Sequence, residues 1–233
     1  MINFDEVTTP VRYDSWSTPA TGYSLDRIGN YRIHRENYPR GAYHMWGIDR
    51  KIYYQVTKPI PITILQVLEG SHWTDLMVDD PPHYRAMQLY AQACTGNVLV
   101  VGLGLGLVVH ELVKNPKVQR VKVIEKSQEV IGLVSKYVHQ SRPAELVLTQ
   151  GDIWAVLDTE LASTHWDFVI IDIWRSETAA EKSKLLPQVL RLWVLIHEQS
   201  PTTKTVFHGF VPMSDVKIVD DDIIPLVIDA EGG

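Results

Sequence analysis

Hydrophobic and polar positions follow two different patterns along the chain. Up to about residue 95, short aromatic or β-branched runs are separated by proline and glycine, which is typical of strands joined by turns. We predict strands at residues 51–56, 62–68 and 73–78, the last two forming a hairpin, and a short helix at 83–94. Pro59 and Pro61 are interpreted as punctuation between the first two strands.

From Asn97 onward, continuous apolar runs alternate with amphipathic helical patterns. Strands are predicted at residues 97–102, 121–125, 145–149, 166–172 and 204–210. Helices are predicted between them, the longest at about 177–199 with Pro187 as a site for a kink, and 223–228 is a candidate further strand. This alternation predicts an α/β fold with a parallel, doubly wound sheet, preceded by a small β-rich N-terminal domain.

Charge and composition divide the chain into three parts: residues 1–95, 96–210 and an acidic tail at 211–233. The tail has one lysine against six acids, and it therefore carries most of the net charge of -6. Because 45% of the residues are hydrophobic, we expect a packed core and not disorder. A lone Cys94 indicates a reducing compartment, and neither a signal peptide nor a membrane span is predicted, so we expect a cytoplasmic protein.

Glycines and acids at the carboxyl ends of the predicted strands form the candidate ligand site, because these ends meet at one edge of a parallel sheet. The first strand runs into Gly102-Leu103-Gly104-Leu105-Gly106, where the backbone can approach a ligand closely. The alternative is a tight turn that binds nothing.

An acidic residue ends or closely follows each of the next three strands. Glu125 could accept hydrogen bonds from a ribose, and its alternative is a solvated acid. Asp152, beside Ile153, suits an adenine and could also cap a helix. Asp172 could orient an amine or bind the cationic end of a cofactor, or it could simply pin a loop.

These motifs carry a family resemblance. Through VLVVGLGLG, VKVIEKSQEVI, LTQGDIW and WDFVIIDIW, residues 97–210 resemble the class I S-adenosylmethionine-dependent methyltransferase superfamily. The arrangement is most similar to the spermidine synthase group, which also has a β-rich domain before the glycine motif, a turn like VLEG at 67–70 and a tyrosine at the position of Tyr84. The resemblance implies a Rossmann-like sheet that binds S-adenosylmethionine or its decarboxylated form.

The resemblance implies four roles at the site. The glycines would wrap the methionine part and Glu125 would hold the ribose, while Asp152 would bind the adenine amine and Asp172 would face the reacting end. The implied cofactor-binding residues are Gly102, Gly104, Gly106, Glu125, Lys126, Asp152, Ile153 and Asp172. Asp172 and Tyr84 are the candidates for aligning an acceptor.

Two departures bear on the reaction. The spermidine synthase group has acids where this chain has Leu105 and Arg175, and those acids handle the polyamine. We therefore expect a methyltransferase acting on a small-molecule acceptor. The alternatives are an aminopropyltransferase and a non-catalytic nucleoside-binding or assembly protein that retained the fold.

Other ligands are less favoured. Leu107 replaces the third glycine of the dinucleotide fingerprint, and the histidines lack the spacing of metal ligands, so neither NAD nor a metal is expected. Residues 27–58 combine seven basic residues with six aromatic rings. That composition suits nucleic acid, a homodimer interface or an ordinary β-rich surface, of which nucleic acid is not favoured.

Overall fold

The computed structural model describes residues 11–46, 51–138, 144–174 and 179–208 of the chain. The predicted strand at 223–228, the acidic tail and Arg175 lie outside these residues. Within them, no helix combines the length and the apolar character that crossing a membrane requires.

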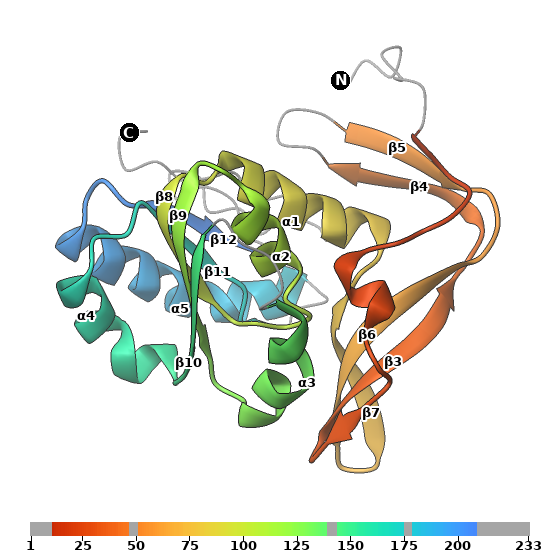
Figure 1. Cartoon of the computed structure of the whole chain (residues 1–233), viewed down its shortest axis with the longest axis horizontal. Coiled ribbons are helices and arrows are strands. Elements are labelled where there is room, and N and C mark those ends of the chain that lie inside the picture. Colours follow the sequence, from red (N-terminus) through yellow and green to blue (C-terminus); the bar gives the residue numbers. More distant parts are fainter. Residues whose placement is uncertain (1–10, 47–50, 139–143, 175–178, 209–233) are drawn as a thin grey trace.

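A five-stranded parallel sheet forms the centre of the C-terminal part, in the order β10-β9-β8-β11-β12 (Figure 1). The order reverses direction between β8 and β11, as it does in Rossmann-like sheets, and a ligand crevice is expected at such a switch point. The strands are β8 (Gly96–Val101), β9 (Val118–Glu125), β10 (Glu145–Gln150), β11 (Phe168–Ile171) and β12 (Lys204–Phe207). All five were predicted, and the parallel, doubly wound fold is confirmed.

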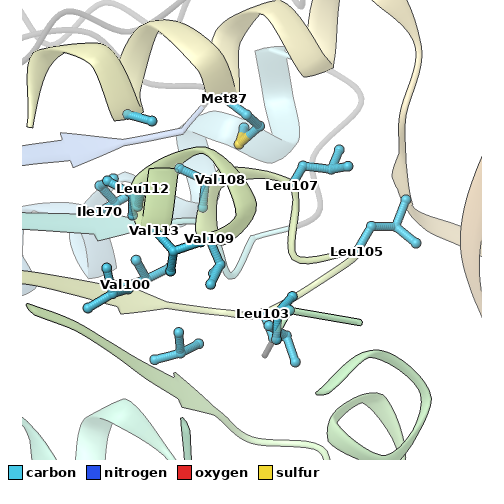
Figure 2. Close-up of a cluster of buried hydrophobic side chains, with 14 of the residues drawn as sticks. Met87, Val100, Leu103, Leu105, Leu107, Val108, Val109, Leu112, Val113 and Ile170 are labelled. Carbon is cyan, nitrogen blue, oxygen red and sulfur yellow. The ribbon is translucent and has the colours of Figure 1, made fainter. Parts of the chain in front are cut away.

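Helices cover both faces of this sheet, because alternate side chains of β8 point into two separate apolar clusters. Val98 and Val100 pack with residues of α1, α2 and α3, whereas Leu99 and Val101 pack with residues of α4 and α5. Figure 2 shows Val100 and Ile170 of the sheet together with Val109, Leu112 and Val113 of α2, which belong to the same apolar cluster. The helices are α1 (Pro81–Ala93), α2 (Leu107–Lys114), α3 (Gln128–Val138), α4 (Ile153–Ser163) and α5 (Ala179–Gln199), which contains Pro187.

The N-terminal part is β-rich, as predicted, but it contains more strands than the sequence indicated. One antiparallel sheet has the order β2-β3-β6-β7, and a second sheet has the order β1-β5-β4. The predicted hairpin is β6-β7. The strands are β1 (Val11–Tyr13), β2 (Arg27–Ile28), β3 (Tyr31–Tyr38), β4 (Gly41–Trp46), β5 (Lys51–Val56), β6 (Ile60–Glu69) and β7 (His72–Val78), with a short 3-10 turn at Pro19–Gly22.

The interpretation of Pro61 as punctuation was wrong, because β6 begins at Ile60 and contains it. At Pro61 the strand pairs with β3 alone, since its pairing with β7 starts at Ile64. Proline has no backbone N–H to donate, so it is tolerated where a strand has no neighbouring strand on one side.

The predicted domain boundary at residue 95 falls in the short link between α1 and β8. Because α1 packs against α2, this helix belongs to the layer that covers the parallel sheet. The division into three parts stays a prediction.

Candidate functional site

Two glycines of the turn after β8 have a positive φ and close neighbours at the position of a Cβ, which is backbone at Gly102 and a flexible side chain at Gly104. Gly102 has a φ of +96°, and a Cβ there would collide with the backbone oxygen of Asp172. Gly104 has a φ of +51°, and a Cβ there would collide with the thioether of Met77 on β7. The turn therefore needs glycine both for its backbone conformation and for its close contacts.

Gly106, the third glycine of the predicted cofactor site, lies at the start of a helix. It is the N-cap residue of α2 with a φ of +69°, and it is buried against Val134 and Val138 of α3. It does not line the pocket described next.

A pocket of about 330 Å³ lies at the carboxyl ends of the parallel strands. Its floor and sides come from both parts of the chain, because Tyr31, Leu65, Leu76 and Met77 of the β-rich sheet face the loops after β8 to β11. Seven of the predicted cofactor-binding residues line it: Gly102, Gly104, Glu125, Lys126, Asp152, Ile153 and Asp172.

Glu125, the last residue of β9, is held by backbone amides of two loops. Its Oε2 accepts a hydrogen bond of 2.7 Å from the Leu103 amide, and its Oε1 accepts one of 2.8 Å from the Ser127 amide. A carboxylate has about four acceptor positions, so two remain for a ligand. The interpretation as a merely solvated acid does not fit this arrangement.

Asp152 has one of the two roles left open by the sequence, the capping of a helix, and it also lies in the lining of the pocket. Its Oδ1 accepts a hydrogen bond of 3.1 Å from the Trp154 amide, which caps α4, and it also lines the pocket. Its Oδ2 lies 2.8 Å from Nζ of Lys126. The hydrogen bond from Lys126 lowers the pKa of the Asp152 carboxyl, which therefore stays ionised.

Asp172 follows β11, and its backbone lies against Gly102 of the glycine turn. Burial raises the pKa of its carboxyl, and the neighbouring His83 acts in the opposite direction. No hydrogen bond to its carboxylate occurs within the described part of the chain.

Two histidines beside Asp172 were missed by the sequence analysis. His83 is the third residue of α1 and His208 follows β12, and their ring centroids lie 4.9 Å apart. Burial lowers the pKa of His83 to about 4, with His208 acting in the same direction and Asp172 opposing it. The three residues are distant in sequence, so no local motif could have indicated them.

Tyr84, the second catalytic candidate, lies away from the pocket. Its hydroxyl donates a hydrogen bond of 2.8 Å to Oε1 of Glu111, and its ring makes an edge contact with Trp16. Burial and this carboxylate raise the pKa of the Tyr84 hydroxyl. Nothing in this arrangement places Tyr84 against a ligand in the pocket.

Leu105, at the position of the missing acid, is completely buried. Its backbone N–H contacts Sδ of Met77 at 3.1 Å, and its backbone oxygen accepts a hydrogen bond of 2.9 Å from the Tyr23 hydroxyl. The side chain is thus part of the core (Figure 2), and the position offers no group for binding an amine.

The basic and aromatic segment at 27–58 uses several of its arginines internally. Arg27 and Arg32 stack on the ring of Trp73 at 5.1 and 4.1 Å. Arg35 donates to the backbone oxygens of Thr21 and Tyr23. These contacts fit the interpretation as an ordinary β-rich surface; Arg50 lies outside the described residues.

Comparisons with known proteins identify no family for this chain. No family model matches it, and no curated protein matches it. Among solved structures, it is similar to the O-methyltransferase TomG from Streptomyces achromogenes, involved in tomaymycin synthesis and solved with SAM. That match has a TM-score of 0.43 and 18% identity, and it covers 58% of each chain. A second match is the N-terminal domain of EvdMO1 with SAH bound, with a TM-score of 0.32 and 20% identity, covering 40% of this chain and 38% of the other. The chain thus spans little more than half of the first structure, and such partial similarity leaves the function to be argued from the site.

Proposed function

We propose that the chain is an S-adenosylmethionine-dependent methyltransferase that acts on a small-molecule acceptor. The observation that carries the proposal is the position of Glu125. Its carboxylate lines the pocket at the end of β9, the second strand of the parallel sheet along the chain. It also accepts a hydrogen bond from the Leu103 amide in the glycine turn, which lines the same pocket. A nucleoside without phosphates is recognised largely through its ribose hydroxyls and its base. A carboxylate that accepts hydrogen bonds from the two ribose hydroxyls, beside a backbone without side chains, suits such a ligand.

The other residues of the pocket fit the remaining parts of this cofactor. Asp152 and Ile153 offer a carboxylate and an apolar side chain to the amine and ring of an adenine. Gly102 and Gly104 leave room for the methionine part, and Asp172 gives the reacting end a carboxylate. A volume of about 330 Å³ lies within the usual range for small-molecule sites.

When bound, S-adenosylmethionine supplies an electrophilic methyl group on a sulfonium sulfur. The chain's task is then to hold an acceptor in line with this group, and positioning of that kind can contribute about 7 to 11 kcal/mol. The carboxylate of Asp172 aligns the acceptor and takes its proton where the acceptor carries one. Leu76, Met77 and Trp174 add apolar side chains to the lining of the same pocket.

Neither alternative is favoured by a specific contact. Aminopropyl transfer needs a carboxylate near the amine, and Leu105 is apolar and buried. The likeness to the spermidine synthase group accordingly stays a prediction. A non-catalytic nucleoside-binding protein would use the same pocket, so only the reaction separates it from a methyltransferase.

Ligand-induced stabilisation tests the proposal. Thermal unfolding is measured with S-adenosylmethionine, its decarboxylated form and NAD, each in the presence of a chelator. A ligand at a hundred times its dissociation constant adds about 2.7 kcal/mol to stability. We expect stabilisation by S-adenosylmethionine; stabilisation by NAD alone, or by none of the three, contradicts the proposal.

A matched pair of variants links the effect to the pocket. Glu125→Gln removes the charge that holds the ribose and should weaken binding at least about tenfold, since a hydrogen bond to a charged group contributes about 1.5 to 3 kcal/mol. Glu145→Gln is the control, because Glu145 is exposed at the opposite end of β10. Equal affinity of the two variants for S-adenosylmethionine would show that Glu125 does not bind this ligand.

A further inference from the structure

A second set of side chains converges at the wall of the pocket. One nitrogen from each of His83 and His208 and one carboxylate oxygen of Asp172 lie within 4.8 Å of one another. Imidazole and carboxylate are the ligands that zinc and its neighbours in the first transition row prefer in proteins. We propose that His83, Asp172 and His208 bind a divalent first-row transition metal ion.

The backbone places two of these residues side by side. β11 and β12 are adjacent parallel strands in which Ile171 pairs with Phe207, so the next residues, Asp172 and His208, leave the sheet at the same level. The His208 amide donates a hydrogen bond of 2.9 Å to the Ile171 oxygen and continues this pairing. The first turn of α1 brings His83 to the same point, because the Asp80 side chain caps the helix by accepting from the His83 amide at 3.0 Å.

His83 supplies the second, independent observation. Its Nε2 is buried and has no hydrogen-bond partner within the described residues. Leaving such an atom unsatisfied is unfavourable, and the carboxylate of the nearby Asp172 also has no hydrogen bond within the described residues. A bound cation would satisfy both groups at once.

Tyr90 contacts His208 and orients its ring. Its hydroxyl, buried in α1, lies 3.1 Å from Nδ1 of His208, and the two rings are in edge contact. Ligating histidines usually have one ring nitrogen held in this way, which fixes the orientation of the ring. Tyr90 is therefore a positioning residue for the proposed site.

Two histidines favour transition metals over magnesium and calcium, which prefer oxygen ligands. Ligands around a tetrahedral ion with bonds of about 2.1 Å lie roughly 3.4 Å apart. The three side chains therefore approach one another by up to about 1.4 Å on binding, compared with the separation of up to 4.8 Å. Three protein ligands leave a coordination position open, as in catalytic zinc sites.

The consequence for catalysis rests on the proposed function. Asp172 also lines the pocket, so the metal would lie beside the acceptor and lower the pKa of an acceptor hydroxyl. This favours an acceptor with an ionisable hydroxyl or thiol over a carbon. The binding of the metal itself does not depend on the methyl donor, so the two proposals can fail separately.

Titration of the tag-free, chelator-treated chain with Co²⁺ tests the site in the absence of S-adenosylmethionine. We expect one equivalent to bind with a visible absorption band, which Zn²⁺ displaces and excess Mg²⁺ does not. His83→Gln, His208→Gln and Asp172→Asn should each weaken binding at least about a hundredfold, and Tyr90→Phe at least about tenfold. His110→Gln is the control, since His110 is also partly buried but hydrogen-bonds to Tyr23 outside the cluster.

Histidine side-chain NMR provides a readout that needs no variant. Zn²⁺ should shift the ring signals of His83 and His208 and leave those of the exposed His72 and His165 unchanged. Weak binding that involves several surface histidines, or Co²⁺ affinity that is unchanged in the ligand variants, overturns the proposal.

Discussion

At the residue scale, the turn after β8 shows how packing selects glycine. Gly102 combines a positive φ with a Cβ direction that points at the backbone of Asp172, and backbone cannot move aside as a flexible side chain can. The sequence indicated that these glycines approach a ligand. It could not indicate that Gly104 also makes room for Met77, because that contact joins β7 to a loop far along the chain.

Gly102→Ala should therefore destabilise the fold by about 1 to 3 kcal/mol or more, through strain at positive φ and the collision with Asp172. Gly22→Ala is the control, because Gly22 is exposed and has open space around its Cβ position. That variant should stay within about 0.5 kcal/mol of wild type. Urea unfolding of the three proteins measures both values, and equal stability of the two variants would contradict the argument.

His110 should make stability depend on pH. Burial lowers its pKa to about 4, with Lys114 acting in the same direction and Glu111 opposing it. Tyr23, which bonds the Leu105 oxygen, also contacts Nε2 of His110 at 2.8 Å. The unfolded chain takes up the proton first, at its ordinary pKa of about 6.5, so stability should fall as pH drops from about 6.5 to about 4.

Urea unfolding at a series of pH values checks this. His110→Gln removes the titrating group, so its stability should fall less steeply across the same window, while His83 and the carboxylates contribute to both proteins alike. A parallel pH dependence of the two proteins would show that the His110 ring does not titrate as described.

At the scale of elements, the predictable strands are those buried on both faces. β8 and β11 are continuous apolar runs, and each was identified from the sequence. β3 has the pattern YRIHRENY with only Ile33 buried, so it carries no clear alternation and was missed. Its pairing with β6 along eight residues, and not its own composition, makes it a strand.

Asp152 separates the stability of an element from the binding of a ligand. Asp152→Asn keeps a side-chain oxygen that caps α4, so stability should change by only a few tenths of a kcal/mol, whereas Asp152→Ala should cost about 1 kcal/mol. The two variants should nevertheless lose affinity for S-adenosylmethionine together, because both remove the carboxylate. Calorimetric binding combined with thermal unfolding tests this; full affinity in Asp152→Asn would leave the residue with its capping role alone.

At the scale of the whole molecule, the sequence located most of the pocket because consecutive parallel strands deliver their ends to one edge. It could not supply the wall made by Tyr31, Leu65 and Met77, which depends on how the β-rich sheet packs against the glycine turn. His83 and His208 were not identified from the sequence for a similar reason, because only the packing of α1 beside the end of β12 brings them together. A homodimer, for which residues 27–58 could provide the interface, also depends on how two folded chains pack together. It stays a prediction, to be checked by light scattering on the full chain.

Cys94 offers a probe of the whole fold, because it is the one cysteine in the sequence and is completely buried where α1 meets the parallel sheet. Burial raises the pKa of its thiol to about 12, so at pH 8 the folded chain exposes neither the sulfur nor a thiolate. Alkylation should therefore proceed only through unfolding, and ligands that stabilise the fold should slow it in proportion. S-adenosylmethionine at a hundred times its dissociation constant should slow alkylation about a hundredfold under conditions where refolding is faster than labelling. Rapid labelling of the native chain that no ligand slows would show that α1 opens locally, without loss of the pocket.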